Sequence, residues 1–131
     1  MTVCARLNDI ANGAPVFAEP VRADYRAMLM RCAAAVGQCG YNTAIDWLQT
    51  GVPGVFVPFA EAGEVEQTLR AASLQERYGF GRIAEEELTP ENLAAATMDA
   101  VSRGRFKANG LKFDGAACTS RILVDLLDAR G

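Results

Sequence analysis

The sequence predicts an α/β fold, a three-layer Rossmann-like parallel sheet of about four strands with helices on both faces. Short runs of small and branched apolar residues alternate with longer segments of helical period. The runs lack polar alternation, which is typical of parallel strands covered on both faces. No repeat or low-complexity linker divides the 131 residues, so we expect a single domain over residues 1–131.

Four apolar runs are expected to be the strands, and each is followed by a turn and a helical segment. They are residues 16–18, 33–37, 55–57 and 81–84. The helices are expected at residues 23–32, from Asn42 or Thr43 to before Gly51, at residues 64–78, from Pro90 to Gly104, and from Asp114 and Gly115 onward. Thr89 before Pro90 is a helix start signal, and Gly51, Gly79 and Gly104 are end signals.

Each helix is expected to turn one apolar face inward. The expected inward residues are Tyr25, Met28, Leu29 and Cys32 in the first helix, Ile45 and Leu48 in the second, Val65, Leu69 and Ala72 in the third, Leu93, Thr97 and Val101 in the fourth, and Ile122, Leu123, Leu126 and Leu127 in the last. Residues 1–13 carry the weakest pattern, that of a helix with Leu7 and Ile10 inward.

Composition excludes several classes of function. Thirteen Lys and Arg against sixteen Asp and Glu give a net charge of −3, and no basic run is present, so nucleic acid is not an expected partner. No apolar stretch approaches the roughly 20 residues of a transmembrane helix, and the N-terminus lacks a signal-peptide pattern, so a cytoplasmic location is expected. With no histidine and four cysteines without a Cys-x-x-Cys pair, we expect free thiols, no metal and no imidazole base.

The segment after the second expected strand is a candidate seat for an anion. Gly40 permits a positive φ or a close backbone approach, and Asn42 and Thr43 lie at a helix N-terminus. Free amides at such an end attract phosphate without any Lys or Arg. Asp46, one turn further on, could accept hydrogen bonds from the diol of a ribose.

Each of these residues also has a purely structural interpretation. Thr43 and Asp46 fit a capping box in which Asp replaces Glu. Glu64 and Glu66 lie in an expected first helical turn, where acids favour the helix dipole without any ligand. The position of the two polar segments, both after strand ends, nevertheless predicts that they face one crevice.

Read together, the segment resembles the donor-binding motif of GT-B glycosyltransferases, and it is similar to the family 28 C-terminal domain. The residues that carry the resemblance are Gln38-Cys39-Gly40-Tyr41-Asn42-Thr43, Asp46, Gly51-Val52-Pro53, Pro58 and Glu66-Gln67. The resemblance implies a partial GT-B C-terminal domain that binds a nucleotide diphosphate sugar, most simply a UDP-sugar, as substrate. It implies no metal, no other cofactor and no catalytic residue on this chain.

The resemblance also implies roles for individual residues. Gly40, Asn42 and Thr43 would hold the diphosphate, with Tyr41 in the aromatic position. Asp46 matches a Glu that binds ribose, and Glu66 with Gln67 match the pair that reads the transferred sugar. Three features depart from the family: Gln38 stands where many members have His, the Trp that stacks on the base is missing unless Phe17 replaces it, and Asp46 is one methylene shorter than Glu.

The resemblance covers only the donor half of a GT-B enzyme. It therefore implies that an acceptor-binding domain, in the same chain or another, supplies the catalytic base, and that the Gly-rich first strand of the donor domain is absent. A second hypothesis is a non-catalytic α/β module that self-associates as a homo-oligomer, or that acts as the donor-binding subunit of a two-chain transferase. A third is an unrelated nucleotide-binding protein such as a sugar-nucleotide epimerase, whose carboxylate catalysts we do not find.

Overall fold

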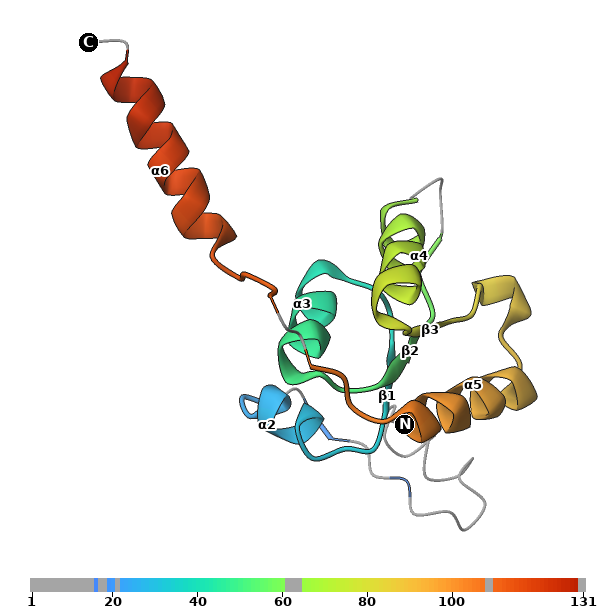
Figure 1. Cartoon of the computed structure of the whole chain (residues 1–131). Coiled ribbons are helices and arrows are strands. Elements are labelled where there is room, and N and C mark those ends of the chain that lie inside the picture. The colour runs from blue at the N-terminus through green and yellow to red at the C-terminus, as the bar shows by residue number, and fades with distance from the viewer. Residues whose placement is uncertain (1–15, 17–18, 21, 61–64, 108–109, 130–131) are drawn as a thin grey trace.

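The described strands form one parallel sheet. The computed structural model describes residues 16, 19–20, 22–60, 65–107 and 110–129. Strands β1 (Ala35–Gly37), β2 (Gly54–Phe56) and β3 (Gly81–Arg82) lie in the order β1-β2-β3. Both pairings are parallel, which confirms the predicted sheet type (Figure 1). Of the remaining expected strand, Val16 lies outside any strand, and residues 17 and 18 lie outside the described residues, as do residues 1–13.

Several helix ends lie where the sequence signals them, whereas the helix expected at residues 23–32 is shorter. They are α2 (Tyr25–Leu29), α3 (Tyr41–Thr50), α4 (Glu66–Tyr78), the 3₁₀ turn η2 (Glu85–Glu87), α5 (Pro90–Arg103) and α6 (Gly115–Asp128). Gly51 and Gly79 end α3 and α4 with φ of 66° and 74°, the left-handed region that glycine enters without strain. The Thr89 hydroxyl accepts a hydrogen bond from the Asn92 amide at 3.1 Å and caps α5.

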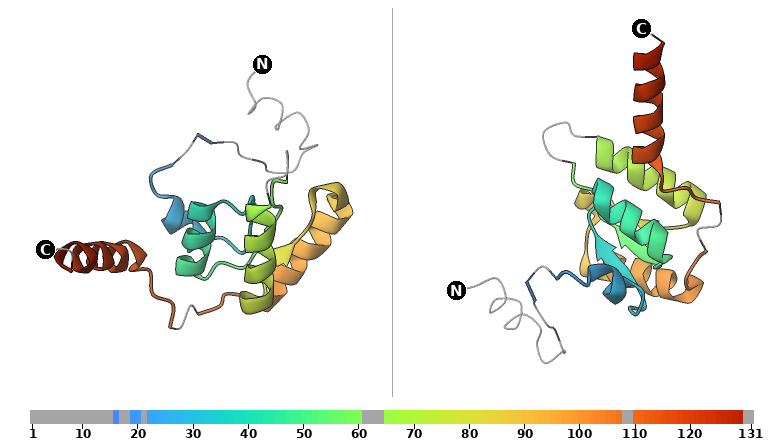
Figure 2. Two further views of the ribbon diagram at one scale, coloured as in Figure 1. Left: turned by 90° about the horizontal axis from the view of Figure 1, so that it is seen from above. Right: turned by 90° about the vertical axis from the view of Figure 1, so that its left-hand side faces the viewer.

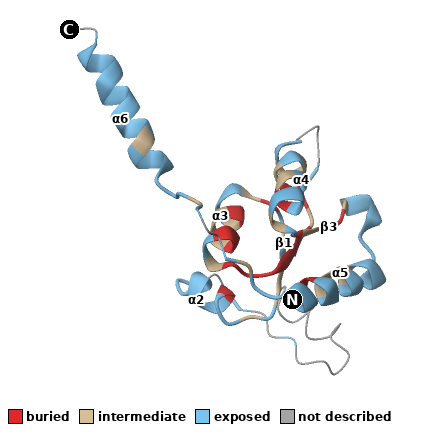
Figure 3. Ribbon diagram, viewed as in Figure 1, coloured by how far each residue is buried: buried red, intermediate tan, exposed pale blue. Residues whose placement is uncertain are grey.

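Helices cover both faces of the sheet, as predicted. Adjacent residues of β2 point to opposite faces. Phe56 packs among residues of α3 and α4, whereas Val55 packs with Ile83 and with Ala100 of α5. The central strand β2 is buried along its whole length, and β1 forms an edge of the described sheet (Figures 2 and 3).

Trp47 is the centre of the larger core cluster. Its ring stacks on Phe56 with 4.3 Å between centroids, and its indole N–H donates to the Tyr25 hydroxyl at 3.2 Å. A Cβ on Gly54 would come within 2.5 Å of Cζ3 of Trp47 and 2.8 Å of the Ala35 carbonyl oxygen. Glycine at position 54 therefore allows α3 to lie directly on the sheet.

Helix α2 is shorter than expected. It ends at Leu29, and Cys32 lies beyond it; of the four residues expected inward, only Leu29 is buried. The guanidinium of Arg105 donates hydrogen bonds to the carbonyl oxygens of Leu29 and Cys32, at 2.6 and 2.8 Å. A side chain from far along the chain thus satisfies the end of this short helix, a contact that local spacing does not reveal.

The inward face expected for α4 was wrong. Val65 and Leu69 are exposed, whereas Ala71 and Leu74 are buried. The buried stripe starts at the polar residue Gln67, whose side-chain oxygen accepts a hydrogen bond from the Phe59 amide at 3.3 Å. Because this face begins with a polar residue, the spacing of apolar residues alone does not identify it. In α5 the buried residue is Ala100 and not Val101, whereas Leu93 packs beside Ala100 as expected. In α3, Leu48 is buried as expected and Ile45 is half-buried.

Helix α6 extends away from the rest of the described molecule (Figure 1). It was expected to pack its apolar face inward, but none of its residues is buried. The residues exposed on it include Ile122, Leu123, Leu126 and Leu127. Periodicity predicted the amphipathic helix correctly and could not show what covers it. Among the described residues, no helix is long and apolar enough to cross a membrane.

Candidate functional site

The loop that follows β1 contacts α4, the helix that follows β2, beyond the carboxyl end of these strands. Residues 38–40 connect β1 to α3, and the chain after β2 leads to the first turn of α4. Arg70 of α4 joins residues 38–40 to the first turn of α4. One guanidinium nitrogen, Nη1, donates to the Cys39 carbonyl oxygen at 2.7 Å, and the other, Nη2, pairs with the carboxylate of Glu66.

Tyr41 lies at the same junction. The guanidinium carbon of Arg70 is 5.9 Å from the centre of the Tyr41 ring, within cation–π range. Gln67 is fixed beside Glu66 by its bond to the Phe59 amide. The structure therefore brings Glu66 and Tyr41 to one guanidinium, whereas the Gln67 side chain contacts the chain that follows β2.

The N-terminus of α3 is open. Its first internal hydrogen bond runs from the Ala44 amide to the Gly40 carbonyl at 3.0 Å, and Gly40 has no side chain to cap it. In the described part of the chain, the amides of Tyr41, Asn42 and Thr43 donate no hydrogen bond. Three donors and the positive end of a ten-residue helix therefore point to the same place.

One sequence interpretation of this turn was wrong, and one of the two roles open to Gly40 is excluded. The capping box fails because Thr43 is the third residue of α3, not its cap, and the Asp46 side chain turns to Arg26 instead. Gly40 has φ −62° and ψ 156°, so it does not use a positive φ. A Cβ there would meet only Thr43 Oγ1, at 3.9 Å, among the described residues, an ordinary contact. The fold by itself does not require glycine at position 40.

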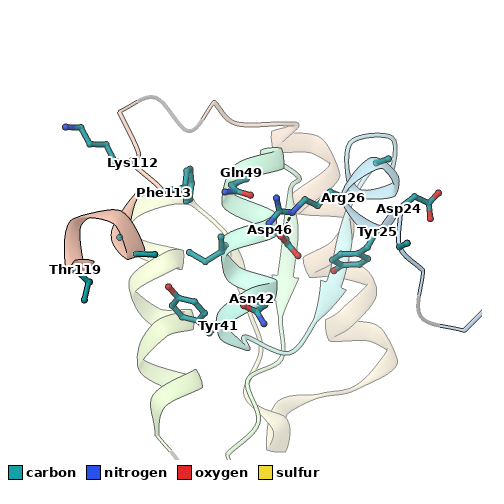
Figure 4. Close-up of a pocket in the computed structure, with 15 residues that line it drawn as sticks. Asp24, Tyr25, Arg26, Tyr41, Asn42, Asp46, Gln49, Lys112, Phe113 and Thr119 are labelled. Carbon is teal, nitrogen blue, oxygen red and sulfur yellow. Dashed lines mark hydrogen bonds and ion pairs between the residues drawn. The ribbon is translucent and has the colours of Figure 1, made fainter. Parts of the chain in front are cut away.

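Asp46 lines a cavity of about 1110 Å³ on the outer side of α3. Its carboxylate accepts a hydrogen bond from Nε of Arg26 at 2.6 Å, and its side chain is 17% exposed. Figure 4 shows Asn42, Asp46 and Gln49 along α3, with Tyr25 and Arg26 on one side and Phe113 on the other. This volume is large enough for a nucleotide-sized ligand.

The expected site residues thus fall into two groups around the start of α3. Tyr41, Asn42 and Asp46 line the cavity, whereas Glu66 pairs with Arg70. Gln67 follows Glu66 in α4, and its side chain binds the Phe59 amide. Tyr41 belongs to both groups. Gln38 is exposed in the loop before them, and Gly40 and Thr43 lie at the helix start without lining the cavity.

Sequence reasoning missed both arginines. Arg70 lies four residues after Glu66 on one helix face, and this spacing could have identified the pair. Arg26 lies twenty residues before Asp46 and has no local signal. Beside Arg70, burial raises the pKa of the Cys39 thiol to about 11, although the nearby guanidinium lowers it in part, so this cysteine stays a neutral thiol. Within the described ranges, no three acidic, Cys or His side chains gather to hold a metal ion.

Comparison with known proteins identifies the family. The model of the glycosyltransferase family 28 C-terminal domain matches residues 13–113. This chain belongs to that family. The resemblance inferred from the sequence is thereby confirmed, and the parallel sheet with helices on both faces fits a Rossmann-like part of such a domain.

Curated relatives are similar over nearly the whole chain. A UDP-N-acetylglucosamine–N-acetylmuramyl-(pentapeptide) pyrophosphoryl-undecaprenol N-acetylglucosamine transferase from Rhizobium johnstonii is 31% identical over 95% of this chain and 33% of its own length. Transferases of the same name from Brucella anthropi and Mesorhizobium japonicum are 29% and 28% identical, over 89% and 98% of this chain and 32% and 37% of their own lengths. The chain thus spans about a third of these relatives' length. No solved structure matches it significantly.

Proposed function

We propose that the chain is the nucleotide-diphosphate-sugar binding portion of a glycosyltransferase, and that its donor is a UDP-sugar. The observation that carries this proposal is the uncapped N-terminus of α3, with Asp46 held one turn further along a cavity. A diphosphate needs several donors and a positive field, and a ribose diol needs an acceptor nearby. The relatives described above, which are similar over 89–98% of this chain, carry UDP-N-acetylglucosamine in their names.

In this proposal each residue has a defined role. The amides of Tyr41, Asn42 and Thr43 bind the diphosphate, and Gln38 adds a side-chain donor. Gly40 leaves room for phosphate oxygens to approach the backbone, which explains a glycine that packing does not require. Asp46 binds the ribose hydroxyls, and Glu66 with Gln67 read the sugar.

The chemistry is metal-independent in this account. The charge that develops on the leaving diphosphate is stabilised by the backbone amides and dipole of α3, which are fixed before the reaction. No base is assigned to this chain. We propose that an acceptor-binding domain, in the same chain or another, supplies it, and that the reaction takes place in the cytoplasm, where the free thiols of Cys32, Cys39 and Cys118 would stay reduced.

The exposed apolar face of α6 supports a partner. Ile122, Leu123, Leu126 and Leu127 are each more than half exposed, and such a face is stabilised by association. We propose that the acceptor-binding domain covers it. A donor-binding subunit that self-associates through α6 is the second candidate. Light scattering distinguishes them: a monomer that co-purifies with a separate acceptor-domain protein supports the first, and a dimer that Leu126→Glu dissociates supports the second.

Calorimetry tests the donor assignment. The 131-residue chain is titrated with UDP, TDP and GDP and with UDP-N-acetylglucosamine, and Glu91→Gln, which removes one carboxylate charge at an exposed position of α5 outside the cavity, serves as control. We expect binding of the uridine compounds, with Asp46→Asn weaker by tenfold or more. A folded chain that binds none of these compounds overturns the proposal.

A further inference from the structure

Arg70 lies between the two halves of the candidate site. Its side chain is 19% exposed, and its guanidinium contacts the Cys39 carbonyl, the Glu66 carboxylate and the face of Tyr41. Cys39 is 31 residues away in sequence and belongs to the loop before α3, whereas Glu66 belongs to the first turn of α4. One planar group therefore holds both ligand-facing segments at once.

The bond to Cys39 also orients a neighbouring donor. In a trans peptide the C=O of one residue and the N–H of the next point in opposite directions. Fixing the Cys39 carbonyl on Arg70 therefore fixes the Gly40 amide to point away from Arg70. This amide donates no hydrogen bond within the described residues, and it precedes the three free amides of α3.

The pairing with Glu66 restricts an otherwise free carboxylate. The side chain of Glu66 is 71% exposed, so without a partner it would sample several rotamers. Arg70 binds one carboxylate oxygen, Oε1, and Oε2 has no partner among the described residues, so it can accept from a ligand hydroxyl. A guanidinium can bind a carboxylate and a carbonyl at fixed angles, whereas a lysine ammonium is a single point charge.

We propose that Arg70 is a positioning residue that couples diphosphate binding to recognition of the transferred sugar. This inference rests on the proposed function. Arg70 acts through the Cys39–Gly40 peptide on the phosphate side and through Glu66 on the sugar side. It makes the donor's two parts bind cooperatively.

The test compares UDP with UDP-N-acetylglucosamine by calorimetry on the full chain. The wild type is expected to bind UDP-N-acetylglucosamine about tenfold more tightly than UDP, because one hydrogen bond to a charged group contributes about a factor of ten in affinity. Arg70→Met is expected to remove this preference and to weaken UDP severalfold. Arg70→Lys restores part of the UDP affinity but not the preference. Arg77→Met, an exposed arginine on the same helix, changes neither.

A cycle with Glu66→Gln isolates the coupling. Glu66→Gln alone is expected to lose the preference for UDP-N-acetylglucosamine over UDP while its UDP affinity stays unchanged. The double variant with Arg70→Met is expected to show the same ratio of the two affinities as Glu66→Gln. Thermal unfolding checks that each variant is folded, and if Arg70→Met is not, Arg70→Lys decides by the same readout. A folded variant at position 70 that keeps the wild-type preference overturns this inference. A wild type that binds neither compound overturns the proposed function instead.

Discussion

Nε of Arg26 lies 2.6 Å from Oδ1 of Asp46, and this contact joins α2 to the outer face of α3. Arg26 is 61% exposed, so the pair contributes little to stability. Its effect is on direction, because it keeps the carboxylate at the cavity and away from the helix backbone. Of the two carboxylate oxygens, only Oδ1 is engaged by a side chain among the described residues.

The position of Asp46 predicts a specific loss of ribose recognition. UDP is compared with 2′-deoxy-UDP by calorimetry in the wild type and in Asp46→Asn. Loss of the 2′-hydroxyl should weaken binding by the wild type roughly tenfold, since a hydrogen bond to a charged group is lost. The same loss should have little effect in Asp46→Asn. If the variant discriminates the two nucleotides as well as the wild type does, Asp46 does not bind the ribose.

Gly40 and Gly54 should respond in opposite ways to alanine. At Gly40 the backbone suits alanine and the space is open, so Gly40→Ala should keep or slightly raise the melting temperature while UDP affinity falls about tenfold. At Gly54 the added methyl meets Trp47, so Gly54→Ala should lower the free energy of unfolding by about 1–3 kcal/mol. Thermal unfolding and calorimetry check both. Full UDP affinity in Gly40→Ala would mean that no phosphate approaches there.

The contrast between local and long-range signals explains what the sequence could predict. Thr89, Gly51 and Gly79 are signals read within a few residues, and the structure confirms the helix ends that they predict. Arg26 and Arg105 contact partners 20 and 76 residues away, so the local spacing of residues could not predict these contacts. The predictions for the inward faces of α4 and α6 failed for a similar reason, because periodicity identifies an apolar face but not the element that packs against it. The ligand roles of the site residues stay predictions.

Arg105 is expected to stabilise the ends of two helices. Its guanidinium donates to the Leu29 carbonyl at the end of α2, to the Cys32 carbonyl just beyond it and, at 3.2 Å, to the Thr50 carbonyl at the end of α3. A cation at such ends also favours both helix dipoles. Arg105→Met should lower the free energy of unfolding by about 1–2 kcal/mol in urea titrations. Arg103→Met, which removes an exposed pair with Asp99 and a cation from the last turn of α5, should cost less, under about 1 kcal/mol. Equal losses in the two variants would contradict this role.

The Cys39 thiol predicts a pH dependence at the alkaline end. Burial raises its pKa to about 11 from the ordinary 9.0, so the unfolded chain releases this proton first as the pH rises. The contribution to stability is complete below pH 9 and is lost between pH 9 and about 11. Urea unfolding of the wild type should therefore lose more stability over this window than that of Cys39→Ala. Parallel curves for the two proteins would show that the thiol does not titrate with a raised pKa.

Amide chemical shifts measured by NMR during a UDP titration test the central claim most directly. If the start of α3 binds the diphosphate, the amides of Gly40, Tyr41, Asn42 and Thr43 should move furthest, and inorganic pyrophosphate should move the same signals. Asp46→Asn should leave the pyrophosphate response intact. Saturable shifts confined to other elements, with these four amides unmoved, would contradict the account.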